Sequence, residues 1–184
     1  MALKATIYKA DLNVADMDRD YYADHSLTLA CHPSENAERL MVRLLAFALN
    51  ADERLEFTRG LSTDDEPDLW RRSLSGDVEQ WIEVGLPSEE RLKKAAGRAA
   101  EVCVIAYGPR TAPVWWEKNR DLLARNRRLE VLYLPPEQSE ALQGLLGRTM
   151  QLQCTIQDGE AWFSSDNGNA EVRLERWQTL AAQP

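Results

Sequence analysis

A single acidic side chain, Glu83, interrupts an apolar stretch near the middle of the sequence. An ionised carboxylate in such surroundings is costly unless a cation, hydrogen-bond donors or a metal ion compensate it. A second group of carboxylates flanks a proline shortly before it, at Asp64, Asp65, Glu66 and Asp68. Hard oxygen ligands from a turn and an adjacent strand suit a divalent cation such as Mg²⁺ or Mn²⁺. The candidate metal ligands are therefore Asp65, Glu66, Asp68 and Glu83.

Two lysines further along the chain, Lys93 and Lys94, are candidate catalytic cations. A lysine beside a phosphodiester under attack orients the water or offsets the charge of the transition state. On the expected helix Lys93 lies at the flank of the apolar face, nearer the sheet than Lys94, so the helix phase favours Lys93. Glu35 and Glu38, at the start of an earlier helix, are further candidates for a ligand or a base in the same cleft.

These groups also have purely structural explanations. A run of acids in a loop is usually a solvated surface, and Glu83 can pair with a neighbouring Lys or Arg at the rim of the sheet. Glu35 and Glu38 also suit the positive end of a helix dipole. Charges such as Arg91 and Lys94 ordinarily lie opposite the apolar face of an amphipathic helix. Both explanations stay open on the sequence alone.

A further pattern combines aromatic and basic residues. The adjacent tryptophans Trp115 and Trp116 offer stacking surfaces for nucleobases. A basic stretch follows them, formed by Arg120, Arg125, Arg127 and Arg128. The structural alternative is that these cations stabilise the C-terminus of a helix, with one tryptophan in the core and its neighbour at the surface.

Composition limits the class of protein. A length of 184 residues and an apolar fraction of 44% suit one globular domain with a sizeable core. The formal net charge of −8 argues against general attraction to nucleic acid or to anionic membranes. No segment is apolar for long enough to cross a bilayer, and the N-terminus lacks the apolar core of a signal peptide. We therefore expect a cytoplasmic protein without a membrane partner.

The cysteines and histidines are few and far apart. Cys31, Cys103 and Cys154 are odd in number and widely spaced, which predicts reduced and mostly buried thiols. His25 and His32 do not have the spacing of helical zinc ligands. A structural zinc site and a histidine-based nucleophile are therefore not expected.

Apolar periodicity predicts the helices that position these groups. One helix is expected to begin with Ser34 as its cap and to run to about residue 50. Another begins at Ser88, and two more cover 112–125 and 136–146. Pro67 is expected at the first position of a short helix.

Alternating apolar positions and turn residues predict the strands. The first two strands form a hairpin, and the last three form an antiparallel meander. The strands at 78–84 and 101–107, with a helix between them, have the spacing of a right-handed parallel crossover. The expected strands are 3–14, 22–31, 55–58, 78–84, 101–107, 129–134, 149–157, 160–164 and 170–176.

Several long motifs resemble the bacterial YaeQ family. They are His-Pro-Ser-Glu at 32–35, Asp-Asp-Glu-Pro at 64–67, Trp-Ile-Glu-Val-Gly-Leu-Pro at 81–87 and Gln-Cys-Thr-Ile-Gln-Asp-Gly at 153–159. The similarity runs from residue 1 to about residue 178. It implies a single domain over residues 1–178 followed by a loose tail at 179–184, in a family whose biochemical activity is not established.

The resemblance also implies a fold, a variant of the PD-(D/E)XK or restriction-endonuclease-like fold. This is a mixed α+β or α/β architecture, a mixed sheet flanked by helices, here with additional N- and C-terminal antiparallel strands. The superfamily pattern places one acid on or before a strand and Glu-x-Lys on the next strand. Glu83 matches the second acid, whereas Gly85 stands at the position of the lysine. Lys93 or Lys94 would replace that lysine by reaching back to the strand end.

Two functions follow as expectations from this resemblance. The first is Mg²⁺- or Mn²⁺-dependent hydrolysis of phosphodiester bonds in DNA or RNA. The second is a non-catalytic nuclease-fold protein that binds a protein partner in nucleic-acid metabolism or transcription. The net charge of −8 and the missing lysine favour the second function.

Overall fold

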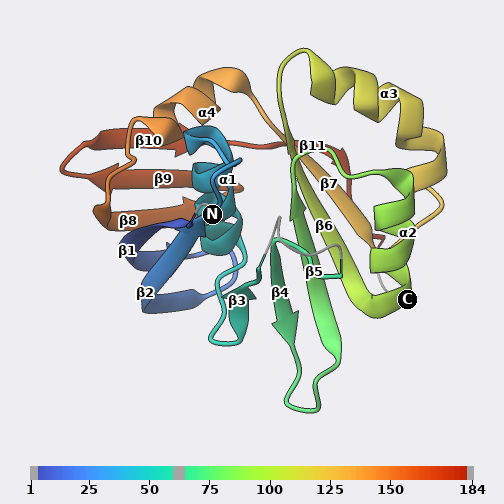
Figure 1. Cartoon of the computed structure of the whole chain (residues 1–184), viewed down its shortest axis with the longest axis horizontal. Helices are drawn as coiled ribbons and strands as arrows, with labels where there is room; N and C mark the ends of the chain where they lie inside the picture. The colour runs from blue at the N-terminus through green and yellow to red at the C-terminus, as the bar shows by residue number, and fades with distance from the viewer. Residues whose placement is uncertain (1–3, 60–64, 182–184) are drawn as a thin grey trace. The chain divides into compact units, whose positions relative to one another are not determined.

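The computed structural model of the protein describes residues 4–59 and 65–181. The chain divides into two compact units, each made of two separate segments. Unit 1 contains Met1–Ala51 and Glu137–Leu174, and unit 2 contains Asp52–Pro136 and Glu175–Pro184. Each unit has its own mixed sheet and two of the four helices in the described part, so the fold is α+β (Figure 1). Whether the two units behave as the single domain expected for residues 1–178 stays a prediction.

Unit 1 is built on a five-stranded sheet in the order β10-β9-β8-β1-β2. The hairpin of β1 with β2 and the meander from β8 to β10 are antiparallel, as the sequence predicted, while β1 and β8 are parallel neighbours. Side chains alternate along β1, with Leu12 and Val14 buried and Asp11 and Asn13 exposed. One sheet face is therefore apolar and the other polar. The strands are β1 (Thr6–Asp16), β2 (Tyr21–Cys31), β8 (Thr149–Gln157), β9 (Glu160–Ser165) and β10 (Gly168–Val172).

The first helix of unit 1, α1 (Ala37–Leu49), begins later than the sequence analysis predicted. Ser34 is not its cap, because the Ser34 hydroxyl is hydrogen-bonded to the His32 ring at 2.6 Å. Asn36 is the cap, and its side-chain oxygen accepts a hydrogen bond from the backbone N–H of Arg39 at 2.9 Å. The second helix, α4 (Pro136–Gln143), starts at the border of the units.

Unit 2 is built on a six-stranded sheet in the order β11-β7-β6-β5-β4-β3. Its central strands β5, β6 and β7 are parallel, and α2 and α3 connect them, as expected of crossover connections. Ser88 caps α2, as predicted. The elements are β3 (Leu55–Phe57), β4 (Leu69–Arg72), β5 (Val78–Val84), α2 (Glu89–Arg98), β6 (Ala99–Tyr107), α3 (Thr111–Leu123), β7 (Leu129–Leu134) and β11 (Glu175–Gln178).

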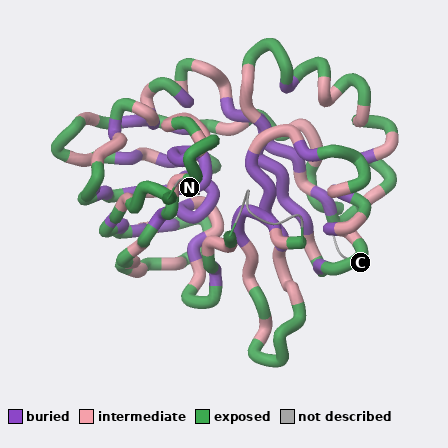
Figure 2. Tube along the Cα trace, in the orientation of Figure 1, coloured by how far each residue is buried: buried purple, intermediate pink, exposed green. Residues whose placement is uncertain are grey.

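Helices α2 and α3 pack on the same face of this sheet (Figure 1). The face carries Trp81, Val104 and Val131, all 0% exposed, and α2 places Ala95 against it. Small residues such as Ala95 allow a helix to approach a sheet closely. Figure 2 shows these central strands buried, whereas the turn between β4 and β5 is exposed, with Leu74 fully accessible.

Two expectations for unit 2 are wrong. Pro67 does not open a helix; the chain after it continues as β4, because Asp68 donates its backbone N–H to the carbonyl of Ile82 in β5 at 3.0 Å. The expected last strand at 170–176 is two strands, β10 in unit 1 and β11 in unit 2, the latter paired with β7. Sequence periodicity does not reveal which sheet a strand joins.

The three cysteines are free thiols, and Cys103 and Cys154 are buried. Burial raises the pKa of the Cys154 thiol to about 12. None of the helices in the described ranges combines the length and the apolar character needed to cross a membrane. Asp64 and residues 182–184 of the expected tail lie outside the described residues.

Candidate functional site

Glu83 lies near the end of β5, on the face that α2 and α3 cover, and it is only 4% exposed. One carboxylate oxygen, Oε1, accepts hydrogen bonds from Trp81 Nε1 at 2.8 Å and from Arg91 Nε at 2.7 Å. No donor among the described residues reaches the other oxygen, Oε2. An arginine and an indole thus compensate the buried acid that the sequence analysis singled out.

Asp68, immediately before β4, is the second buried acid and is 2% exposed. Its Oδ2 accepts a hydrogen bond from the backbone N–H of Val84 at 2.8 Å, which fixes the carboxylate at the edge of β5. Burial raises the pKa of Glu83 to about 7, and the negative charge of Asp68 acts in the same direction. The charge of Arg91 and the hydrogen bonds to Trp81 and Arg91 oppose this shift. The two acids therefore form a buried pair in which the pKa of Glu83 is raised to about 7.

The other two candidate metal ligands do not join this pair. The side chain of Asp65 is 75% exposed and lies 2.5 Å from Lys94 Nζ, and this hydrogen bond lowers the pKa of Asp65. Glu66 accepts hydrogen bonds from the backbone and guanidinium of Arg59 at 3.2 and 3.3 Å, and they lower its pKa. Within residues 4–59 and 65–181, no three Asp, Glu, His or Cys side chains gather as metal ligands. Of the candidates Asp65, Glu66 and Asp68, only Asp68 lies beside Glu83, because Asp65 and Glu66 pair with Lys94 and Arg59. Which of these acids hold a metal ion stays a prediction.

Among the two candidate lysines, it is Lys94 that reaches the acidic turn. Lys93 is 68% exposed and pairs with Glu89 on its own helix at 2.7 Å. Helix phase favoured Lys93, whereas the lysine that contacts an acid of this turn is Lys94. The catalytic role of either lysine stays a prediction. Leu92 and Ala95 face the sheet, while the side of α2 that bears Lys94 faces the segment around Asp65.

Arg91 is a functional candidate whose partners the sequence did not reveal. Besides Glu83, it contacts the backbone carbonyl of Glu66, to which its NH2 group donates a hydrogen bond at 2.7 Å. Arg98 donates to the carbonyl of Asp65 at 3.2 Å. The spacing of the basic side chains on α2 was visible in the sequence. Their target, the segment before β4, becomes adjacent only in the folded sheet.

The missing lysine of the Glu-x-Lys pattern has a local explanation at Gly85. This residue has φ of +103°, a conformation that side chains with a Cβ rarely adopt. Its backbone N–H donates to the carbonyl of Ile105 at 2.9 Å and continues the sheet. A lysine at this position would be strained even though the surrounding space is open.

Glu35 and Glu38 belong to unit 1, whereas Glu83 belongs to unit 2. Glu35 is 2% exposed at its side chain and accepts hydrogen bonds from Arg43 Nε at 2.7 Å and Arg39 NH1 at 3.2 Å. Glu38 accepts a hydrogen bond from the hydroxyl of Ser139 at 2.7 Å. Both acids have structural partners within unit 1, and their expected role as ligand or base stays a prediction.

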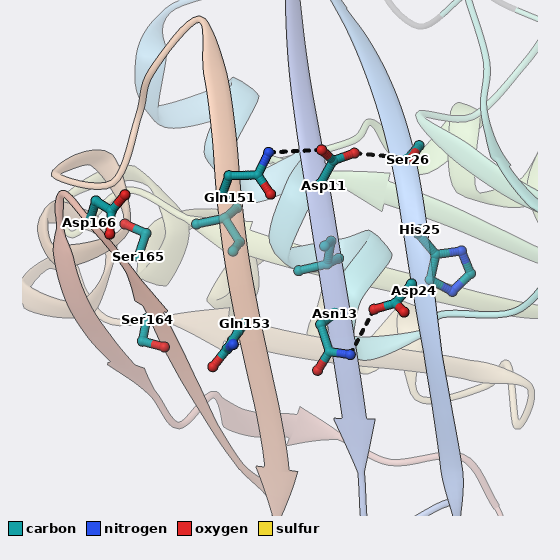
Figure 3. A pocket seen from close by; sticks show the side chains of 12 residues that line it. Asp11, Asn13, Asp24, His25, Ser26, Gln151, Gln153, Ser164, Ser165 and Asp166 are labelled. Carbon is teal, nitrogen blue, oxygen red and sulfur yellow. Dashed lines mark hydrogen bonds between the residues drawn. The ribbon is translucent and has the colours of Figure 1, made fainter.

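No sequence motif indicated a hollow of about 680 Å³ on the polar face of the sheet in unit 1 (Figure 3). Asp11 lies between Gln151 and Ser26 in Figure 3 and accepts hydrogen bonds from Ser26 Oγ at 3.0 Å and from Gln151 Nε2 at 2.8 Å. Asn13 donates to Asp24 at 2.8 Å. These groups bind one another across neighbouring strands, as on the solvated face of a sheet. The alternation of polar residues along β1 and β8 is its only sequence signal.

The two mixed sheets and their helices define a mixed α+β protein, with a buried pair of acids in unit 2. Its sequence is similar to known proteins along nearly its whole length. The family model described as YaeQ protein matches residues 1–174. The YaeQ protein of Escherichia coli (strain K12) is 53% identical over 178 residues, which cover 97% of this chain and 98% of that protein. The YaeQ protein of Salmonella typhi is 51% identical with the same coverage. The chain belongs to the YaeQ family.

Two crystal structures of YaeQ proteins share this fold. That of Xanthomonas axonopodis pv. citri gives a TM-score of 0.92 at 51% identity and covers 95% of this chain and 99% of its own. That of Pseudomonas syringae gives a TM-score of 0.90 at 36% identity, with coverage of 95% and 97%. The predicted family membership is confirmed, and so is the mixed α+β class.

Proposed function

We propose that the protein is a metal-dependent, nuclease-like hydrolase of phosphodiester bonds in DNA or RNA, with a variant of the PD-(D/E)XK fold in unit 2. The observation that supports it is the buried pair of Glu83 in β5 and Asp68 immediately before the adjacent strand β4. Two buried acids beside each other, one with its pKa raised to about 7, are typical of functional sites. Arg91 on α2 provides positive charge beside Glu83, and Lys94 on the same helix pairs with Asp65 in the segment before β4.

The donor chemistry of this pair fits Mg²⁺ or Mn²⁺. Mg²⁺ is usually held by one or two carboxylates, with waters and substrate phosphate oxygens completing its coordination. Asp68 and Glu83 supply two such carboxylates, and Oε2 of Glu83 accepts no hydrogen bond from the described residues. A bound metal would supply Lewis-acid stabilisation of the phosphodiester and an activated water.

Protons compete with cations for this site. Because the pKa of Glu83 is raised to about 7, part of its population is protonated at neutral pH. A cation binds the ionised carboxylate, so binding releases protons and strengthens as the pH rises through 7. Lys94 would place its charge against the phosphate, while Arg91 holds Glu83 and the carbonyl of Glu66 in position.

The test combines calorimetry with Mg²⁺ or Mn²⁺ and a cleavage assay on labelled single- and double-stranded DNA and RNA. We expect Glu83→Gln and Asp68→Asn to abolish metal-dependent cleavage, and Lys94→Ala to reduce it by roughly a hundredfold. Lys93→Ala is the matched control and should cut like the wild type, because Lys93 pairs only with Glu89 in the described structure. Unchanged cleavage by Glu83→Gln contradicts the proposal.

A second candidate function is that of a non-catalytic scaffold that binds a protein partner. The ion pair of Arg91 with Glu83, together with glycine at position 85, favours it. In that case neither Mg²⁺ nor Mn²⁺ produces binding heat. Neither the wild type nor the variants at Asp68 and Glu83 cleave nucleic acid. The protein would instead retain a partner in a pull-down through its acidic surface.

A further inference from the structure

A pocket of about 570 Å³ lies in unit 2, away from the acid pair. The C-terminal half of α3, the loop after it and β11 form its wall, and neither Asp68, Glu83 nor Lys94 contributes to it. The residues of this wall that the argument uses are Trp116, Arg120, Arg127 and Trp177. They include aromatic and basic residues that the proposed function does not use.

The aromatic side of the pocket is an ordered stack. Trp177 lies between Tyr133, with ring centroids 4.6 Å apart and planes at 9°, and Trp116, at 5.6 Å and 30°. Trp116 and Trp177 are half-buried, so the stack reaches from the core to the pocket. Indole surfaces held in this way are ready to contact a planar base without further ordering.

The basic side of the pocket lies in a stretch of net positive charge, whereas the chain as a whole is negative. Although the whole chain carries −8, the stretch 111–128 has only two acids, Glu117 and Asp121, against five Lys and Arg residues. Arg120 makes loose ion pairs with these acids, at 3.4 and 3.9 Å. Arg127 pairs with no acid in residues 4–59 and 65–181. Guanidinium groups whose ion pairs are long or absent are available to bind a phosphate.

Stabilisation of the helix end explains Arg120, since it lies in the last turn of α3. The same explanation does not extend to Arg127, which follows the end of α3 at Leu123. The loop that carries Arg127 is held in place, because Gln178 Nε2 lies 2.9 and 3.1 Å from the carbonyls of Leu123 and Asn126. The pocket wall is therefore built before any ligand arrives.

We propose that this pocket binds a nucleoside phosphate, with the base against Trp116 and the phosphate on Arg120 and Arg127. The ligand is a free nucleotide or one unit of a single strand, since both present the same chemistry. An aromatic ring joined to a phosphate matches both sides of the pocket, whereas a bare anion or an apolar peptide matches only one. The site is separate from Glu83 and requires no metal.

The test uses the full-length protein in EDTA and follows tryptophan fluorescence and calorimetry. The probes are adenosine monophosphate, a short single-stranded oligothymidylate, adenosine and inorganic phosphate. We expect adenosine monophosphate or the oligonucleotide to bind more tightly than adenosine or phosphate. A preference for the oligonucleotide assigns the site to a strand, and equal affinity assigns it to free nucleotides. Equal binding of inorganic phosphate and nucleotide overturns the proposal, as does no binding of either nucleotide probe at millimolar concentration.

Arg127→Ala and Arg125→Ala form a matched pair of variants. Both side chains are exposed and belong to the same loop, but Arg125 lines a different pocket. Arg127→Ala should weaken binding by roughly tenfold, and Arg125→Ala by no more than about twofold. Equal losses would indicate unspecific attraction and overturn the proposal.

Variants at Trp116 test the aromatic side of the pocket. We expect Trp116→Leu to lose binding and Trp116→Phe to retain most of it, with near-UV circular dichroism showing that both variants fold. Full binding by Trp116→Leu contradicts base stacking, and if this variant does not fold, the arginine pair decides. Glu83→Gln should bind normally, so a failure of the nuclease proposal leaves this site intact.

Discussion

The carboxyl group of Glu83 connects the local chemistry to the stability of the protein. Its pKa in the folded state is about 7, against 4.5 for an unperturbed glutamate. The folded protein therefore binds more protons than the unfolded chain between these pH values. Since stability rises with pH only where the unfolded state binds more protons, this group lowers the free energy of unfolding as the pH rises from 4.5 to 7.

We predict that Glu83→Gln removes this part of the pH dependence. The amide keeps the shape of the protonated acid but does not titrate. Between pH 4.5 and 7 the free energy of unfolding should therefore fall by roughly 1–3 kcal/mol less in the variant than in the wild type. Urea denaturation at a series of pH values measures the difference. Glu130→Gln tests the same rule at a second position, because burial also raises the pKa of Glu130. Parallel pH profiles for Glu83→Gln and the wild type would rule out the raised pKa.

At the residue scale the sequence identified the acid but not its partners. An apolar strand around Glu83 was enough to predict a compensating group. The choice of Arg91 and Trp81 required the register of β5 against α2, which brings their nitrogen atoms to the same oxygen. The neighbour Asp68 required the pairing of β4 with β5.

At the scale of elements, the N-terminus of α1 shows how caps compete. Ser34 and Asn36 both have side chains suited to capping. Ser34 is bonded to the ring of His32, so Asn36 satisfies the exposed N–H of Arg39. The sequence contains both candidates and does not rank them.

We predict that Asn36→Ala destabilises the protein by about 1 kcal/mol and that Ser34→Ala has a smaller effect. The reason is that only Asn36 accepts a hydrogen bond from a free N–H of the first turn of α1. Chemical denaturation gives the two values. Hydrogen exchange at the start of α1 should also quicken in the Asn36 variant alone. A larger loss in Ser34→Ala would show that the cap is assigned wrongly.

At the scale of the whole molecule, the question is whether the two units unfold together. Each unit has its own sheet, and each is assembled from segments far apart in the sequence. The core of buried side chains around Trp81 lies entirely within unit 2. Leu152 in β8 is 2% exposed and belongs to unit 1.

We predict that Leu152→Ala costs roughly 2–5 kcal/mol, because it removes a buried side chain and leaves a cavity. Hydrogen exchange by mass spectrometry should then quicken mainly in β1 and β8 and little in β6, since units with separate cores open separately. Val104→Ala in β6, which is 0% exposed, is the mirror-image control. Equal acceleration in both units would instead support the single domain expected from the sequence.

The sequence by itself determined most of the elements and the family. Apolar periodicity predicted the hairpin of β1 and β2, the crossover from β5 to β6 and the cap Ser88, since these depend on neighbours in the chain. The motifs at 64–67 and 81–87 pointed to the YaeQ family, which the match over residues 1–174 confirms. Local propensity and local spacing suffice for such features.

Only the tertiary structure decided how distant segments meet. It split the last expected strand between two sheets, turned the segment after Pro67 into β4, and placed Lys94 rather than Lys93 against Asp65. It also paired Asp65 with Lys94 and Glu66 with Arg59, while Asp68 lies beside Glu83. The physical reason is that each outcome depends on hydrogen bonds and ion pairs between segments far apart in the chain, which periodicity along one segment does not encode.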